Sequence, residues 1–459
     1  MKIEDIQTGM PWPPEAEYDR IRQMRKNREL FEGKHEKVFG DAWSRLRPDD
    51  YGAKYMLVLN FYKRMTTLFA DLLLGETPGL TTGDSGSAEQ QHLDRIVDEN
   101  DFWNTAYEVA LDVPAYGSGV FKARLENGKA IIDSVQPLHW FKITDPTNIK
   151  EILAHVIAFQ YEIDEREYLS FEIHQRGRII TRTYRKSGDM IGTLLEEEEL
   201  PTGVDYFLVV PVQNLLTSYR LYGKDDYEDL DSVISEITLR LAQISRILDK
   251  HADPNMYGPD AALSQDLETG EWTPPTGGHY FSVPAEGVTP GYMTWEGNLE
   301  SAYKQIEVLI EQLYLLSETS PAAFGQLKTG LAESGTALRR LMMAPLARVN
   351  RMRARFDPAL KEILWVASLL EVSARRQGAV ELDSITINWR DGLPDDEKEQ
   401  TEIYTQAVTG GIMSQETAVK NYQHLDDEGL TSEMERIQAQ QEMPLPASTQ
   451  FLFGEDEEE

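Results

Sequence analysis

Cysteine is absent from this chain of 459 residues. That absence excludes disulfide bridges, thiol nucleophiles and metal centres held by thiolates. Long hydrophobic runs are also missing, since no apolar stretch approaches the roughly 18 residues that a membrane-spanning helix needs. The first residues lack the apolar segment of a secretory signal. The sequence therefore predicts a protein that is made inside the cell and does not associate with membranes.

Positive charge is scarce. The chain has 45 Lys and Arg against 78 Asp and Glu, which gives a formal net charge of −33. A protein that coats nucleic acid needs a basic face to displace counterions from the phosphates, so this function class is disfavoured. Any contact with DNA is expected to be local or weak. The 41% hydrophobic and 27% charged residues predict a folded protein of two or three domain-sized units.

Recognisable catalytic and metal-binding motifs are missing as well. The eight histidines show no H-x-x-x-H or H-E-x-x-H spacing, so no metal site is expected. The stretch Gly83–Ser87 resembles a serine protease nucleophile loop, but no histidine supports it and it is interpreted as a linker. Gly330 and Gly335 have P-loop spacing without the essential lysine. We assign no catalytic residue and no cofactor, and we predict that the protein is not an enzyme.

One segment reverses the overall charge. Residues Ser334 to Phe356 contain no acid and six arginines: Arg339, Arg340, Arg348, Arg351, Arg353 and Arg355. Apolar residues recur there at three- and four-residue intervals, which predicts a long helix reaching about Arg376 with a kink at Pro345. Two interpretations of the arginines stay open. They pair with acids in this chain or in a neighbouring subunit, or they face phosphates.

The first half of the chain predicts an α+β unit. Helical periodicity covers residues 15–33, 62–74, 88–99 and 102–116. Asn127-Gly128 between two apolar runs is a strong hairpin signal. Further strands are predicted at Ala154–Tyr161, Tyr168–Gln175, Ile179–Arg185 and Phe207–Pro211. Several of these strands are expected to form a small antiparallel sheet.

The second half predicts a helical hairpin. Amphipathic helices at Asp225–Lys250 and Leu299–Ser317 bracket an insert, 251–296, that is rich in proline, glycine and aromatic residues. Such a pattern indicates an antiparallel helical pair with a small cap at its far end. The aromatic residues of the insert either anchor a partner or form the core of the insert itself: Tyr257, Trp272, Tyr280, Tyr292 and Trp295.

The C-terminal region is strongly acidic. A strand is predicted at Ile385–Trp389, followed by helices at 395–409 and 414–425, the second capped by Ser414. From Asp391 onward there are 18 acidic and 3 basic residues. We expect the final residues to be a solvated tail.

This order of segments resembles that of the portal, or connector, proteins of tailed bacteriophages, of the kind found in siphophages. The short motifs that carry the resemblance keep their order over most of the chain. They are Leu59-Asn60-Phe61, Gly75-Glu76-Thr77-Pro78, Ala110–Gly119 with Val120-Phe121-Lys122, Val135-Gln136-Pro137, Tyr222–Tyr227, Ala252-Asp253-Pro254, Ser334–Leu338, Ile387-Asn388-Trp389 with Leu393–Asp396, and Gly411–Ala418.

The resemblance implies a mainly helical α+β portal fold in a ring oligomer. On this map the segments are a wing (1–226), two stem helices (227–250 and 297–318), a clip (251–296), a tunnel loop (319–334), a long kinked helix with a wing strand (335–392), and a crown with an acidic tail (393–459).

The same resemblance implies a function. Twelve copies would typically form a channel at one capsid vertex of the virion, assembled in the host cytoplasm, through which double-stranded DNA is packaged and ejected. The terminase large subunit and later a head–tail adaptor would dock on the clip aromatics. Major capsid protein and scaffolding protein are further expected partners.

Candidate residues follow from this map. Those expected to approach DNA weakly in the channel are Gln326, Lys328, Thr329, Arg246 and Lys250, whereas the six arginines are expected to tie neighbouring subunits together. Two alternatives of other classes stay open. One is an acidic cytoplasmic enzyme that uses carboxylate chemistry, and the other is a helical scaffold or adaptor protein.

Overall fold

The computed structural model describes most of the chain. The described residues are 2–46, 57–84, 86–252, 256–258, 264–265, 272–273, 280–283, 289, 291–292, 299–326, 335–390, 397–423, 425 and 427–442. Two compact units can be distinguished. The larger comprises Met1–Leu327 and Leu341–Gly392, and the smaller comprises Lys328–Arg340 and Leu393–Glu459.

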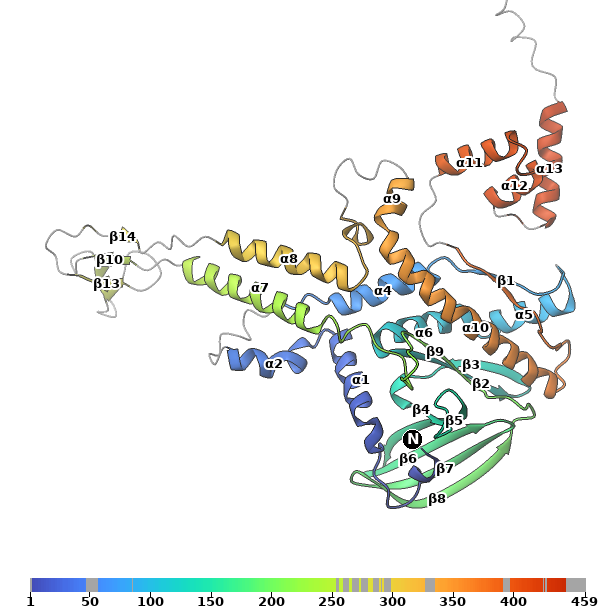
Figure 1. Cartoon of the computed structure of the whole chain (residues 1–459), viewed down its shortest axis with the longest axis horizontal. Coiled ribbons are helices and arrows are strands. Elements are labelled where there is room, and N and C mark those ends of the chain that lie inside the picture. The colour runs from blue at the N-terminus through green and yellow to red at the C-terminus, as the bar shows by residue number, and fades with distance from the viewer. Residues whose placement is uncertain are drawn as a thin grey trace, which may run out of the picture. The chain divides into compact units, whose positions relative to one another are not determined.

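Helices form the first part of the larger unit. They are α1 (Tyr18–Phe31), α2 (His35–Leu46), α4 (Phe61–Leu74), α5 (Ala88–Glu99) and α6 (Phe102–Tyr116), shown in Figure 1. All except α2, which the sequence analysis did not predict, lie where the periodicity predicts them. Short 3-10 turns, η1 (Ile3–Asp5), η2 (Glu15–Glu17) and η3 (Pro137–His139), lie between the larger elements.

Gly117 ends α6 and allows a close backbone approach. It has φ 76°, in the left-handed region that glycine adopts without strain. A Cβ at this position would lie only 2.3 Å from the carbonyl oxygen of Gly223. Only glycine therefore lets the end of α6 meet the segment that leads into the helical hairpin.

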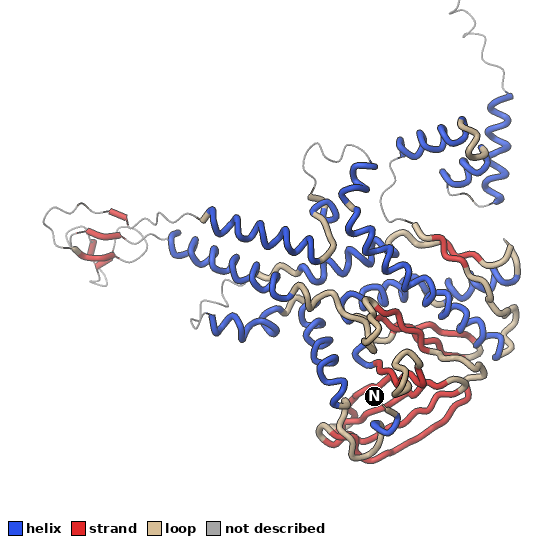
Figure 2. Tube along the Cα trace, viewed as in Figure 1, coloured by secondary structure: helices blue, strands red, loops and turns tan. Residues whose placement is uncertain are grey.

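Two antiparallel sheets follow α6 (Figure 2). The first has the order β3-β2-β9 and contains β2 (Ser118–Glu126), β3 (Lys129–Ser134) and β9 (Val209–Gln213). Asn127 and Gly128 both have positive φ, 52° and 79°, which confirms the predicted hairpin turn. The second sheet runs β4-β5-β6-β7-β8 in sequence order. Its strands are Trp140–Thr144, Ile152–Ile163, Arg166–Gln175, Arg178–Ser187 and Met190–Pro201.

The edge strand β8 is one that the sequence prediction missed. Its four consecutive glutamates, 196–199, do not read as a strand because they lack apolar alternation. The strand forms because β7 supplies opposite charge across the ladder. Arg182 Nε lies 2.9 Å from Glu197 Oε1, and Arg178 Nη1 lies 2.9 Å from Glu199 Oε1. Acidic residues on an exposed edge also discourage pairing with other chains.

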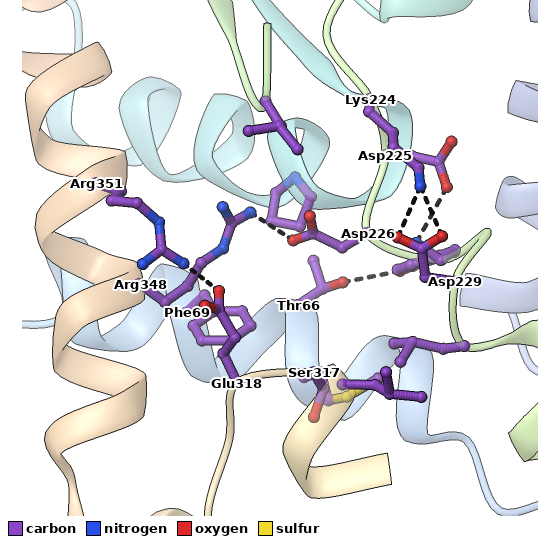
Figure 3. A pocket seen from close by; sticks show the side chains of 16 residues that line it. Thr66, Phe69, Lys224, Asp225, Asp226, Asp229, Ser317, Glu318, Arg348 and Arg351 are labelled. Atoms are coloured by element: carbon purple, nitrogen blue, oxygen red, sulfur yellow. Dashed lines mark hydrogen bonds and ion pairs between the residues drawn. The ribbon is translucent and has the colours of Figure 1, made fainter. Parts of the chain in front are cut away.

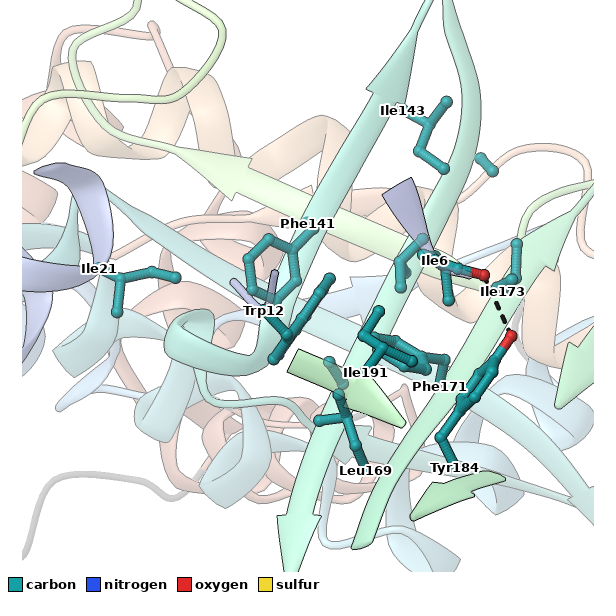
Figure 4. Packing of buried hydrophobic residues seen from close by; sticks show 13 residues of the cluster. Ile6, Trp12, Ile21, Phe141, Ile143, Leu169, Phe171, Ile173, Tyr184 and Ile191 are labelled. Carbon is teal, nitrogen blue, oxygen red and sulfur yellow. Dashed lines mark hydrogen bonds between the residues drawn. The ribbon is translucent and has the colours of Figure 1, made fainter. Parts of the chain in front are cut away.

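The N-terminal segment closes one face of the five-stranded sheet. Ile6 is fully buried and Trp12 nearly so, and both pack among sheet residues that include Phe141 and Phe171 (Figure 4). The Tyr184 hydroxyl donates a hydrogen bond of 3.1 Å to the carbonyl of Ile6. Nothing in the sequence pattern predicted that these first residues belong to a core.

The long basic helix is interrupted rather than kinked at Pro345. The structure has a short α9 (Gly335–Leu341) and then α10 (Met343–Ser373), with Met342 as the N-cap of α10. Pro345 thus occupies the first turn of a new helix, where its missing N–H has no intrahelical acceptor to lose. The single kinked helix of the prediction is thus divided into two helices by a break at Met342, three residues before Pro345. A second proline, Pro358, lies inside α10.

The predicted helical hairpin is present with shorter helices. They are α7 (Asp231–Ala252) and α8 (Glu300–Leu316), which pack side by side. Residues 225–230 were expected to be helical. They instead form turns in which Asp225 Oδ1 accepts the amides of Tyr227 and Glu228. After α8 comes η5 (Pro321–Phe324).

Short strands occur in the insert between α7 and α8. They are β10 (Met256–Gly258), β11 (Ser264–Gln265), β12 (Trp272–Thr273), β13 (Tyr280–Ser282) and β14 (Gly291–Tyr292). A further pair joins distant parts of the chain, because β1 (Gly79–Thr81) is antiparallel to β15 (Thr386–Asn388), within the predicted late strand.

The smaller unit contains three helices among its described residues after position 396: α11 (Glu397–Thr409), α12 (Gln415–Gln423) and α13 (Asp427–Glu442). The first two confirm the prediction, and Ser414 Oγ accepts the amide of Thr417 at 3.2 Å as an N-cap should. The sequence reasoning did not predict α13. The acidic tail lies outside the described residues.

None of the helices that the structure describes combines the length and apolar character of a transmembrane segment.

A buried carboxylate ties α10 to α5 and to the first sheet. Glu371 has a fully buried side chain that contacts His92 Nε2 at 2.9 Å, Arg376 Nη1 at 2.5 Å and the amide of Ala130 at 3.1 Å. Burial opposes the charge, but these hydrogen bonds outweigh it and lower the pKa of Glu371 to about 2.

Replacing this carboxylate should make stability depend differently on pH. Because the folded pKa of Glu371 lies below its ordinary value, its contribution is complete above about pH 5 and is lost as pH falls toward 2. We expect Glu371→Gln to lower the free energy of unfolding by about 3 kcal/mol at pH 7 and by much less near pH 3. Denaturant titrations at both pH values measure this.

Glu89→Gln, on the exposed surface of α5, is the matched control and should change stability by less than about 1 kcal/mol. An equal loss at pH 7 and pH 3 for Glu371→Gln would contradict the assigned network.

Candidate functional site

The most distinctive feature of the larger unit is the place where the α7/α8 hairpin joins the rest of the chain. The two helices interlock through an apolar stripe that continues into α4 and α1. This stripe comprises Leu30, Tyr62, Met65, Tyr227, Leu230, Ile234, Ile237, Leu309, Ile310 and Leu313. Its continuity means that the hairpin base shares one core with the unit from which it extends. At ~1.5 Å per residue, the 22 residues of α7 span about 33 Å.

A third helix supports α7 from another side. Trp43 of α2 is buried and its Nε1 donates a hydrogen bond of 3.1 Å to Ser235 Oγ. At the first turn of α7, Asp231 accepts a hydrogen bond of 2.7 Å from the Tyr62 hydroxyl and pairs with Lys26 of α1. An acid at this position also complements the helix dipole. The start of α7 is therefore fixed by α1, α2 and α4 together.

The hairpin entrance is fixed by a buried ion pair (Figure 3). Arg348 of α10 donates through Nη2 to Asp226 Oδ2 at 2.6 Å and to Asn214 Oδ1 at 2.6 Å. The side chain of Arg348 is 9% exposed and that of Asp226 is 29% exposed. Burial raises the pKa of Asp226, and the Arg348 guanidinium and Asn214 amide oppose this shift.

Asn214 is the connecting residue of this junction. Its side-chain nitrogen donates to the carbonyl of Lys224 at 2.9 Å and to Asp226 Oδ1 at 2.8 Å. Its backbone amide donates to the carbonyl of Gly117 at 3.0 Å. One asparagine thus joins the end of α6, the end of β9, the hairpin entrance and, through Arg348, the long helix α10.

A cavity of about 320 Å³ lies beside this junction, between α4, α10 and the ends of the hairpin. Its three cations each have a carboxylate partner. Lys224 contacts Asp229 at 2.6 Å, Arg351 pairs with Glu318, and Arg348 pairs with Asp226. This internal neutralisation favours a structural joint over an anion-binding or catalytic site. Among the described residues, no group of three or more His, Asp or Glu side chains is arranged to hold a metal ion.

The six predicted arginines separate into different environments. Arg348 forms its ion pair with Asp226 of the same chain, and pairing with an acid is one of the two interpretations that the sequence left open. Arg351 makes an exposed pair with Glu318, and Arg353 donates to the carbonyl of Leu72 at 3.5 Å. On α9, Arg339 and Arg340 are exposed, as is Arg355 on α10. Arg355 has no carboxylate partner among the described residues and borders a cavity of about 270 Å³.

The structure does not bring the described DNA-channel candidates together. Arg246 lies half-buried in the part of α7 remote from the hairpin base. Gln326 is exposed after η5, near the base, and its Oε1 accepts from the Tyr314 hydroxyl at 3.5 Å. Lys250 lies in α7, but its side chain is outside the described residues, as are Lys328 and Thr329 entirely.

The clip aromatics are described only in part. Tyr257 in β10 is half-buried, and its hydroxyl lies 2.9 Å from where a Cβ on Gly291 would stand. This packing indicates that Tyr257 contributes to the insert itself. Trp272, Tyr280 and Tyr292 lie in short strands whose side chains are not described, and Trp295 lies outside the described residues.

Sequence reasoning missed the acceptors of the junction. Asn214 and Asp226 carry no motif, and Asp226 stands among other acids in an acidic chain. The one available signal was Arg348, because the helical periodicity places this arginine on the buried face of the helix. Its burial required a partner, but the partner's identity depended on tertiary contacts.

Solved structures similar to this chain include components of gene transfer agent particles. One, from "Virion of native gene transfer agent (GTA) particle", has a TM-score of 0.48 and 12% identity over 91% of this chain and 96% of that chain. Another, from "Neck of empty GTA particle computed with C6 symmetry", has a TM-score of 0.46 and 12% identity over 90% and 95%.

A third, from "Neck of native GTA particle computed with C12 symmetry", has a TM-score of 0.41 and 11% identity over 79% of this chain and 89% of that chain. A comparison with curated proteins finds no match. The family model described as "Phage portal protein, SPP1 Gp6-like" matches residues 14–446. Because this match covers nearly the whole sequence, the chain belongs to the SPP1 Gp6-like family of phage portal proteins.

Proposed function

We propose that this portal protein assembles into a closed ring of twelve copies whose central channel conducts double-stranded DNA during packaging and ejection. The observation that carries this proposal is the α7/α8 hairpin, firmly anchored at its base by a buried ion pair and a shared core. Family membership supplies the context, since portal proteins are structural components of phage particles.

In this proposal α7 and α8 are the stem helices. Their alignment is held by an apolar interface, so each copy contributes a stiff pair of helices, α7 with 22 residues and α8 with 17, or about 33 Å and about 26 Å at ~1.5 Å per residue. The excess of acidic over basic residues in the chain is compatible with a channel through which DNA slides. Strong phosphate contacts would act as barriers to sliding, whereas a net charge of −33 keeps the interaction with DNA weak.

The insert between the stem helices, 251–296, is the clip on which the terminase large subunit and then the head–tail adaptor dock. Small strands and a high aromatic content support this assignment, because aromatic residues are common interface anchors. Residues 319–334 are the tunnel loop, with Gln326, Lys328 and Thr329 closest to DNA. Helices α11 to α13 belong to the crown, and the capsid and scaffolding proteins contact the wing.

Of the two alternative functions, the acidic enzyme would need a pocket with convergent, unpaired acid–base groups. The junction cavity has cations and carboxylates paired with each other instead. A helical scaffold has no need of ring closure, so the oligomeric state decides between it and the portal function.

The ring itself is the first measurement. Native mass spectrometry and electron microscopy of the purified protein should show a closed assembly of twelve copies with an axial opening wide enough for a DNA duplex. A compact monomer, or a closed oligomer without an opening, would refute the proposed function.

The tunnel-loop lysine provides a second test. Replacing Lys328 with alanine should change the rate or yield of DNA packaging while rings still form, because the positive charge nearest the DNA is removed. Lys150→Ala, an exposed lysine between β4 and β5 in the wing, is the matched control. Packaging indistinguishable from the wild type would remove Lys328 from the DNA path.

The buried junction provides a third test with an internal control. Arg348→Met removes the cationic partner of Asp226, which is 29% exposed and keeps its hydrogen bond from Asn214, and should lower the free energy of unfolding by about 1–3 kcal/mol. Arg351→Met breaks a pair whose side chains are 52% and 44% exposed, and should cost less than about 1 kcal/mol. Denaturant unfolding of both variants measures the difference, and equal losses would contradict the role of Arg348.

A further inference from the structure

A third cavity, of about 380 Å³, lies on the side of α6 that faces α1 and β3. Phe31 and Tyr116 supply aromatic walls, and Glu108 and Asp112 supply carboxylates one helical turn apart. Glu108 accepts a hydrogen bond from the Ser134 hydroxyl. Asp112 has no hydrogen bond or ion pair among the described residues, although it is half-buried.

The chemistry of this cavity points to a cation. Burial and the neighbouring Glu108 raise the pKa of Asp112 well above its ordinary value, which means that the chain itself does not compensate this carboxylate. An aromatic wall attracts a guanidinium by cation–π interaction, and a carboxylate binds it in a bidentate manner. Aromatic and acidic groups around one cavity therefore select an arginine side chain.

The chain presents a matching arginine on another surface. Arg355 is exposed on α10 and has no carboxylate partner among the described residues, whereas Arg348 and Arg351 are both paired. Arg355 borders a cavity that Val113 of α6 also lines, and Pro114 lines the adjoining one. Pro114 and Asp112 are two positions apart in α6. At about 100° per residue they are separated by about 200° around the helix, so they project to nearly opposite sides of it.

Complementary groups on different faces of one chain are what a head-to-tail assembly requires. In such an interface each copy uses one face toward one neighbour and a different face toward the other, and repetition of the same rotation closes a ring. A docked guanidinium would also stabilise the charged form of Asp112, which burial and Glu108 otherwise disfavour. The self-pairing of an arginine-rich segment with an acidic surface is favourable in a chain of net charge −33.

We infer that the cavity formed by Phe31, Glu108, Asp112 and Tyr116 receives the Arg355 side chain of the neighbouring copy. This inference rests on the proposed ring, and it adds the pair of residues through which successive copies recognise one another. Arginine and tyrosine are also among the residue types enriched at protein interfaces.

The absence of cysteine from the chain permits a direct test. Two single variants, Arg355→Cys and Asp112→Cys, are mixed in equal amounts, allowed to assemble and treated with a short bifunctional thiol reagent. We expect covalent dimers in the mixture and none with either variant alone. The double variant Arg355→Cys with Asp112→Cys should give a ladder of covalent multimers.

A double-mutant cycle gives an independent readout. Arg355→Gln and Asp112→Asn should each weaken assembly at least tenfold, and together no more than either alone, because both remove the same contact. Arg166→Gln, an exposed arginine of β6 without a carboxylate partner among the described residues, should leave assembly unchanged. Circular dichroism of each variant checks that the fold is retained.

The outcomes separate the inference from the proposed function. Rings that form normally without cross-linking between positions 355 and 112, and additive effects of the two substitutions, would overturn the inference and leave the portal function standing. Failure of the unmodified protein to form rings would overturn both. Cross-linked dimers together with non-additive effects would support the pairing.

Discussion

The arrangement of this protein depends on one buried contact, the ion pair between Arg348 and Asp226 with Asn214 as the shared acceptor and donor. A buried ion pair is costly to desolvate and contributes little to stability compared with apolar packing. The ion pair instead fixes the relative orientation of the elements that it joins, because hydrogen bonds have a defined geometry and apolar contacts do not. It sets where the hairpin begins relative to α10 and β9, and the apolar core then stabilises that arrangement.

Charge compensation follows the same logic elsewhere in the larger unit. Glu371 is buried among donors from α5, β3 and the end of α10, and its low pKa shows that these donors outweigh the cost of burial. The cations of the junction cavity are also matched. Each of these pairings cancels one acid against one base, so the formal net charge of −33 is left over.

Elements that no motif in the sequence predicted also stabilise the larger unit. The family match begins at residue 14, yet Ile6 and Trp12 lie before it and complete the core of the five-stranded sheet. The acidic edge strand β8 is stabilised from within by arginines of β7. Helix α2 packs Trp43 against α7, so that the hairpin is supported by a segment that carried no motif.

Local patterns in the sequence determined most of the helices, though not α2 or α13, the Asn127-Gly128 hairpin and the existence of the α7/α8 pair, because periodicity and turn chemistry act over a few residues. The order of short motifs also determined the family, which the match over residues 14–446 bears out. Tertiary structure alone decided the rest. It placed Pro345 in a first turn, made a strand of four glutamates, buried Ile6, and chose Asn214 and Asp226 as partners of Arg348. The contacts of Ile6 and Arg348 reach far along the chain, and the arginines that pair with the glutamates of β8 lie 15 and 21 residues away on β7, so no local pattern specifies which group will supply them.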